Sequence, residues 1–195
     1  MRRCPDAATQ AGRSGKWVSA LVTILCLSAL IVHITPLVSA QGAGATVAAG
    51  LAKIGSGAST KAAALARLEE AVFQRINGLR QARGLRPVAL TEDLLRPARQ
   101  HSLDMAQRNV LTHADANGRG PGERLDAAGI AWLRYGENVA LCKGYSSPCD
   151  AVVDAWLKSP GHAANLLDPQ LAESAVGVAL ATDGTYYLTQ VFVTR

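Results

Sequence analysis

The sequence predicts an α+β fold, with helices first and a β-hairpin at the end of the chain. Two observations indicate this class. Apolar residues recur at three- and four-residue steps from Leu65 to Leu79, which is the spacing of one face of an α-helix. Near the C-terminus, apolar and small residues alternate over 176–180, the turn residues Asp183-Gly184 follow, and a second apolar stretch covers 186–193. Helices followed by an antiparallel hairpin are typical of an α+β domain.

The first forty residues predict a secretory signal peptide. Four basic residues precede an apolar run over 17–38, and the run ends in Val38-Ser39-Ala40, small residues of the kind that a signal peptidase recognises. An uncleaved membrane anchor is the alternative, because the run is longer than the roughly 17 residues that a spanning helix needs. His33 and Pro36 within the run favour cleavage after Ala40.

Composition limits the remaining chain. Residues 1–40 hold four basic residues and one acidic residue, so their removal lowers the net charge from +5 to +2. No stripe of basic and aromatic residues remains, which argues against a nucleic-acid partner. Residues 41–60 are mostly Gly, Ala, Ser and Thr, and they predict a flexible linker because they cannot bury enough apolar surface. We therefore expect the folded domain over 61–195.

A second helix is predicted from Thr91 to Arg108. Thr91 is a suitable N-cap, and two acidic residues follow it in the first turn. Pro97 removes a backbone donor, and we expect the helix to kink there; a late start of the helix is the alternative. His101 lies one turn before Met105, and we expect it to pack on the buried face of this helix.

Two more helices follow. Residues 121–128 predict a short helix that Gly129 stops, and the adjacent Glu123 and Arg124 are expected to form a cap or an ion pair. Pro148 suits the first position of another helix, which directs its apolar residues inward. Ser159-Pro160-Gly161 is expected to end that helix.

Several short motifs occur in a fixed order between Leu111 and Phe192. These are His113, Gly136-Glu137-Asn138, Trp156, Ser159-Pro160-Gly161-His162 and Tyr187-Leu188-Thr189-Gln190-Val191-Phe192. Together they resemble the CAP superfamily (cysteine-rich secretory proteins, antigen 5 and pathogenesis-related-1 proteins, also called SCP-like), in its bacterial branch. The resemblance covers about residues 65 to 195. It implies an α-β-α sandwich with a central antiparallel sheet between helices.

The resemblance also implies a cleft. In animal and plant members this cleft carries two histidines and two glutamates. The first of each falls on His113 and Glu137, whereas Ser159 and Tyr187 occupy the places of the second glutamate and the second histidine. We expect His162, three residues past Ser159, to supply an imidazole to the same cleft. Asn138 and Gln190 are expected to line it as well.

These residues admit more than one chemistry. The imidazoles of His113 and His162 and the carboxylate of Glu137 suit a divalent metal such as zinc. The interpretation that we prefer is a buried hydrogen-bond network that satisfies the irregular backbone around Gly136 and Gly161. A Ser159 nucleophile is not favoured, because the Gly-x-Ser-x-Gly elbow is absent.

Cys142 and Cys149 are the only cysteines outside the predicted signal peptide. A turn-rich loop of six residues separates them. In an exported protein, an even pair at this spacing predicts a disulfide bond.

The sequence therefore predicts an exported protein, either secreted or located in the periplasm or at the cell surface. We expect it to act as a binding or interaction module for an unknown extracellular ligand or protein, without turnover of its own. The alternatives are a metal-dependent hydrolase that uses His113, Glu137 and His162, and a lipid- or sterol-binding protein. A membrane association is expected only if the signal peptide is not cleaved.

Overall fold

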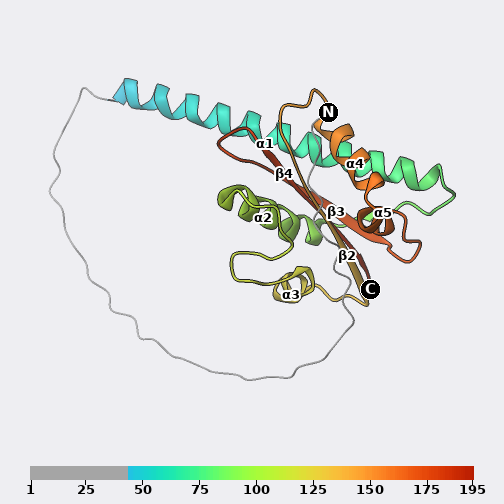
Figure 1. The fold of residues 1–195 in the computed structure, drawn as a ribbon. Helices are drawn as coiled ribbons and strands as arrows, with labels where there is room; N and C mark the ends of the chain where they lie inside the picture. The colour runs from blue at the N-terminus through green and yellow to red at the C-terminus, as the bar shows by residue number, and fades with distance from the viewer. Residues whose placement is uncertain (1–43) are drawn as a thin grey trace, which may run out of the picture. The chain divides into compact units, whose positions relative to one another are not determined.

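The computed structural model describes residues 44–195, with side chains described from Ser59 onward (Figure 1). The predicted signal peptide, its cleavage site and the first residues of the predicted linker lie outside this range. Residues 62–195 belong to one compact unit. Within the described range, no helix combines the length and the apolar character that a membrane span requires.

Helix α1 covers Gly44–Gln81 and begins inside the stretch that composition predicts to be a flexible linker. The structure differs from that prediction. The physical reason is helix cooperativity, since nucleation is the costly step and the part of α1 from Leu65 onward packs on the core. Alanines upstream of this packed part can then extend the helix toward Gly44, each at little cost.

A four-stranded sheet forms the centre of the compact unit. Its strands lie in the order β1 (Ala89–Leu90), β3 (Glu173–Leu180), β4 (Tyr186–Thr194) and β2 (Arg134–Cys142). β4 pairs antiparallel with both β3 and β2, while the two-residue β1 pairs parallel with β3. The predicted hairpin is confirmed, with Gly184 in its turn at φ +85°.

Helices cover both faces of this sheet. α1, α4 (Pro148–Lys158) and α5 (Pro160–Leu166) surround one core cluster, to which the sheet contributes Ala140, Val176 and Leu188. α2 (Glu92–Arg108) and α3 (Pro121–Ala127) pack on the opposite face. The predicted α-β-α sandwich with a central, mainly antiparallel sheet is therefore confirmed (Figure 1).

The helix ends follow the sequence signals, with one exception. Thr91 occupies the N-cap of α2, which continues through Pro97, so the helix does not begin late. Ser147 caps α4 through its side chain, and Pro148 takes the first helical position. Pro160 does more than the predicted helix stop, because it also opens the further helix α5. Strand β2, which carries Glu137, is likewise an element that the sequence pattern does not predict.

A buried arginine joins α1 to the segment between α5 and β3. Arg80 is fully buried, and its guanidinium donates hydrogen bonds to four carbonyl oxygens. The distances are 2.9 Å to Arg86, 2.9 Å to Leu166, 3.0 Å to Asp168 and 3.2 Å to Leu171. The carbonyl oxygens of this irregular segment thus accept hydrogen bonds from a side chain, where a helix or strand would supply backbone N–H groups.

The predicted Cys142–Cys149 disulfide bond is not formed in the structure. Cys142 ends β2 with its side chain in the core, and Cys149 lies in the first turn of α4, packed against the same core cluster. Burial raises the pKa of the Cys149 thiol, and Asp150 adds to this rise. A raised pKa leaves less thiolate at neutral pH, which slows the reaction of this thiol with a disulfide.

Candidate functional site: a buried carboxylate and a polar pocket

Glu137 lies in the middle of β2 and points toward α2 and α3. Its side chain is 1% exposed. His113 Nδ1 lies 2.8 Å from Oε1, and the guanidinium of Arg124 forms an ion pair with Oε2. Both carboxylate oxygens are therefore held by neighbouring side chains, which brings His113 and Glu137 together as the sequence predicts.

The electrostatics keep Glu137 ionised. Burial alone would raise the pKa of this carboxyl group, but the hydrogen bond from His113 and the charge of Arg124 outweigh burial and lower the pKa. An ionised carboxylate only accepts hydrogen bonds, so Nδ1 of His113 carries the proton and donates it. Nε2 of His113 is a buried atom without a hydrogen-bond partner among the described residues.

Arg124 connects this pair to the segment between α2 and α3. Besides Glu137, its guanidinium donates to the carbonyl oxygens of His113 and Arg119, the latter at 3.0 Å. α3 positions the arginine, and Glu123 accepts a hydrogen bond from the backbone N–H of Gly120 at 2.7 Å, which caps the start of α3. The ion pair and the cap expected for this dipeptide are both confirmed.

His101 lies on the buried face of α2, as predicted, and is 1% exposed. Nε2 lies 2.9 Å from the carbonyl oxygen of Thr112, which can only accept, so Nε2 carries the proton. Burial lowers the pKa of the imidazole, which keeps the ring neutral at pH 7. Nδ1 is then an acceptor, and it has no partner among the described residues. A buried acceptor without a partner costs about 1–3 kcal/mol.

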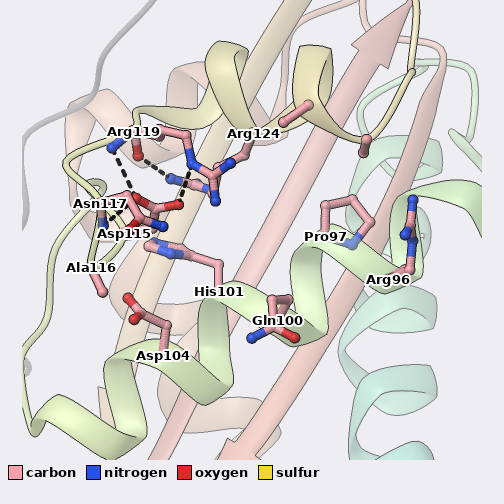
Figure 2. A pocket seen from close by; sticks show the side chains of 12 residues that line it. Arg96, Pro97, Gln100, His101, Asp104, Asp115, Ala116, Asn117, Arg119 and Arg124 are labelled. Carbon is pink, nitrogen blue, oxygen red and sulfur yellow. Dashed lines mark hydrogen bonds and ion pairs between the residues drawn. The ribbon is translucent and has the colours of Figure 1, made fainter. Parts of the chain in front are cut away.

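A pocket of about 300 Å³ lies between α2, the 115–119 segment and α3 (Figure 2). Figure 2 shows the His101 ring projecting from α2 toward Asp115, with Gln100 and Asp104 beside it. Most of the lining side chains are polar or charged, and Pro97 and three alanines supply the apolar part. The sequence pattern does not reveal this pocket, since its walls come from separate segments.

The opposite face of the sheet carries other residues that the sequence assigns to the same cleft. Asn138 follows Glu137 in β2, and successive side chains of a strand point to opposite faces. Its Nδ2 donates to the carbonyl oxygen of His162 at 3.2 Å, and its Oδ1 accepts from Asn165 at 2.9 Å. Asn138 therefore ties α5, and with it His162, to the face away from the Glu137 carboxylate.

The same alternation separates the two β4 residues. Tyr187 packs with Met105 and Ala179 on the α2 side, whereas Gln190 donates to Ser174 Oγ at 3.2 Å on the other side. An odd spacing of three along a strand does not place both on one face. The expectation that Tyr187 and Gln190 both line one cleft is therefore wrong. Ser159 lies between α4 and α5, as C-cap of the first and N-cap of the second.

The donor set for a metal ion does not fit the residues present. Within the described residues, no group of three His, Cys, Asp or Glu side chains is placed to hold a metal. Both oxygens of Glu137 are occupied by His113 and Arg124, and an arginine partner would repel a cation. The zinc set of His113, Glu137 and His162 is therefore not assembled here.

Comparison with known proteins agrees with this fold. The profile of the cysteine-rich secretory protein family, CAP, matches residues 73–192. Uncharacterized protein YkwD of Bacillus subtilis is 34% identical over 125 residues, which is 64% of this chain and 46% of that protein. Uncharacterized membrane protein YlbC of the same organism is 30% identical over 127 residues, which is 65% of this chain and 34% of that protein. The match thus spans less than half the length of either curated relative.

Solved structures show the same architecture. The structure of an extracellular protein containing an SCP domain from Bacillus anthracis has a TM-score of 0.57 and 29% identity, over 66% of this chain and 40% of that chain. An outer surface protein from Borrelia burgdorferi has a TM-score of 0.58 and 20% identity, over 66% of this chain and 93% of that chain, which indicates a shared fold. With a family profile that covers most of its folded part, the chain belongs to the cysteine-rich secretory protein (CAP) family.

Proposed function

We propose that this CAP domain acts outside the cytoplasm as a binding or interaction module and performs no turnover of its own. The state of Glu137 carries this proposal. It is the one carboxylate of the expected cleft, and it is buried with one oxygen on His113 and the other on Arg124. Such a group cannot take up a proton from a substrate or bind a metal without breaking a buried ion pair.

The buried network has a positioning role in this proposal. Arg124 holds the carbonyl oxygens of His113 and Arg119, and thereby fixes the segment between α2 and α3. That segment is one wall of the polar pocket. In this proposal the network positions the residues of a binding surface and does not catalyse a reaction of the bound molecule.

Two observations support an extracytoplasmic location. The first is the sequence 1–40, with basic residues, an apolar run and the small residues up to Ala40. The second is that the similar structure from Bacillus anthracis is described as an extracellular protein. The intact mass of the exported protein tests the location, and we expect a chain that begins at Gln41. A mass that retains residues 1–40 would favour a membrane anchor.

Zinc titration tests the absence of metal-dependent turnover. We expect weak or no binding by calorimetry at pH 7.5 and at pH 6.0, and no change in the variants His113→Ala and His162→Ala. Tight one-to-one binding that weakens at pH 6.0 and disappears in both variants would instead support the metal-dependent hydrolase. Protonated imidazoles do not bind metals, which is why the second pH separates a histidine site from adventitious binding.

The lipid-binding alternative receives no support from the pocket. Charged and amide side chains line most of it, including Arg96, Gln100 and Asn117. A lipid chain would leave these groups without water or a hydrogen-bond partner, which is unfavourable.

A further inference from the structure

Three side chains of α2 line the pocket in one row. Arg96, Gln100 and Asp104 follow one another at intervals of four residues, which places them on the same side of the helix. Figure 2 shows Arg96 at one end of this row and Asp104 at the other, with Gln100 between them. The rise of an α-helix separates the α-carbons of Arg96 and Asp104 by about 12 Å. The pocket therefore carries a basic group at one end and an acidic group at the other.

The basic end is an arginine whose charge is not paired. Arg96 is exposed, and its guanidinium forms no ion pair and no hydrogen bond with the described part of the chain. The other two arginines that line the pocket, Arg119 and Arg124, each pair with a carboxylate of the protein. A guanidinium can donate two parallel hydrogen bonds to one carboxylate. Arg96 can therefore bind an anionic group of a ligand without giving up a partner within the protein.

The acidic end keeps one carboxylate oxygen open. Both hydrogen bonds from Arg108 to Asp104 go to Oδ2. Oδ1 accepts none from the described residues, and it is accessible to solvent, with the Asp104 side chain 15% exposed. An ammonium group donates up to three hydrogen bonds, and a carboxylate oxygen only accepts them. Oδ1 of Asp104 is therefore a suitable acceptor for a cationic group of a ligand.

The remaining pocket wall offers amide groups and small apolar surfaces. Gln100 on α2 and Asn117 on the 115–119 segment are exposed, and neither side chain hydrogen bonds to the described part of the chain. A side-chain amide both donates and accepts, as a peptide group does. Pro97 and three alanines supply the apolar part of the wall. Such a wall suits a ligand that carries peptide groups and small side chains.

We propose that the pocket binds a short zwitterionic peptide, with its terminal carboxylate on Arg96 and its terminal ammonium on Oδ1 of Asp104. Gln100 and Asn117 hydrogen bond to its peptide groups. An extended chain of three residues spans about 10 Å, which is close to the separation of the two ends of the pocket. The volume of about 300 Å³ lies at the lower end of small-molecule sites. This inference names the ligand class of the proposed binding module and rests on that proposal.

The test is a calorimetric titration of the exported protein with trialanine and with two blocked forms of it. N-acetyl-trialanine lacks the ammonium group, and trialanine amide lacks the carboxylate. We expect saturable one-to-one binding of trialanine. Each blocked form should bind about tenfold more weakly, equivalent to about 1.4 kcal/mol, because it loses one charged contact. Absence of saturable binding, or a blocked form that binds as tightly as trialanine, overturns the inference.

Two variants assign the ends of the ligand. Arg96→Gln should weaken the binding of trialanine about tenfold, yet leave the binding of trialanine amide unchanged, because the amide has no carboxylate for the guanidinium. Asp104→Asn should weaken the binding of trialanine to a similar extent and leave N-acetyl-trialanine unaffected. A variant that weakens the free and the blocked peptide equally would contradict the proposed orientation.

Each variant has a matched control outside the pocket. Arg67→Gln replaces an exposed arginine of α1. Asp93→Asn replaces a carboxylate of α2 that, like Asp104, pairs with an arginine. Neither control residue lines the pocket, so both controls should bind trialanine as the wild type does. Equal weakening by a pocket variant and its control would show that the charge acts through the whole protein and that the pocket is not the site.

Analysis of the ligand after the titration separates this inference from the proposed function. If trialanine binds at the pocket and free alanine appears, the site stands and the proposal of a module without turnover is wrong. If trialanine does not bind, the site proposal is wrong, while the zinc titration still decides between module and hydrolase.

Discussion

At the scale of single residues, the notable feature is a buried anion with two different partners. His113 donates to one oxygen of Glu137 and Arg124 pairs with the other. Both partners offset the cost of removing a carboxylate from water, which is several kcal/mol. The group retains its charge because both oxygens are satisfied.

The variant Glu137→Gln should lower the free energy of unfolding at pH 7 by about 3 kcal/mol. The amide keeps the shape but leaves Arg124 buried without a counter-charge, which is the costly outcome of breaking a buried pair. Urea unfolding measures the change. Glu70→Gln on exposed α1 is the control and should change stability by less than about 0.5 kcal/mol.

The same variant has a defined pH dependence. The pKa of Glu137 is lowered from its ordinary value of 4.5, so its contribution is complete above about pH 4.5 and is lost as the pH falls through the folded-state pKa. The difference in unfolding free energy between wild type and Glu137→Gln should therefore shrink below pH 4.5. A difference that stays constant down to pH 2 would contradict an ionised Glu137.

At the scale of elements, two close contacts fix the helices on the sheet. One is the set of hydrogen bonds from Arg80 of α1 to four carbonyl oxygens, and the other is the close approach of α2 to β3. A Cβ atom at Gly177 of β3 would lie 2.3 Å from the backbone carbon of Ala98 in α2, so the two backbones are in direct contact. Ser102 Oγ, one turn further on, donates to the carbonyl oxygen of Gly177 at 2.9 Å.

Gly177→Ala should destabilise the fold by about 3 kcal/mol or more, because α2 must move away from the sheet to admit a methyl group. Gly78→Ala is the matched control in α1, where an added Cβ meets nothing within 4 Å. There the substitution should stabilise by about 0.5–1 kcal/mol, because glycine is a poor helix former. Thermal unfolding should show a lower melting temperature for Gly177→Ala and a higher one for Gly78→Ala. Equal changes in melting temperature would contradict the close contact between α2 and β3.

Arg80→Lys should cost at least about 3 kcal/mol, although it keeps the charge. A lysine ammonium cannot reach the four carbonyl oxygens that the guanidinium spans, and hydrogen bonds to charged groups contribute about 1.5–3 kcal/mol each. Arg83→Lys is the control, because the exposed Arg83 side chain donates to a single carbonyl oxygen among the described residues, that of Leu79 at 3.3 Å, and the substitution should be nearly neutral. Urea unfolding measures both changes. Equal unfolding free energies of the two variants would show that the hydrogen bonds of Arg80 contribute little to stability.

At the scale of the molecule, the compact unit does not include the first part of helix α1. The compact unit starts at Ala62, whereas the helix starts at Gly44. The first residues of α1 that pack on the core are Leu65 and Leu68. Cooperativity of the domain therefore depends on the second half of this helix.

A chain that begins at Lys61 should fold with a melting temperature within a few degrees of that of the chain that begins at Gln41. The reason is that no core residue is lost, and circular dichroism during heating measures it. A chain that begins at Gln74 loses Val72 and Phe73 from the core and should unfold at a much lower temperature. Equal loss of stability in both truncations would mean that residues 41–60 stabilise the domain.

Local sequence determined most of the elements, although not β2, α5 or the start of α1. The helical spacing from Leu65, the cap at Thr91, Pro148 and the Asp183-Gly184 turn each act over a few residues, so the hairpin and four helices were predictable. The order of the motifs also indicated the family. β2 was missed because Gly136-Glu137-Asn138 places a charged and an amide residue in a strand whose two faces are both covered.

Only the tertiary structure decided the site. Strand alternation sends Glu137 to one face and Asn138 to the other, and pairing in the sheet then fixes which helix each one meets. His162 belongs to α5 and therefore lies on the same side of the sheet as Asn138. Arg124 forms the ion pair with Glu137, whereas the sequence predicted an ion pair without identifying this partner. The pocket beside His101 arises from three segments that are not adjacent in sequence. Local pattern fixes elements because helices and turns depend on neighbouring residues, whereas a site depends on the long-range packing that brings separate segments together.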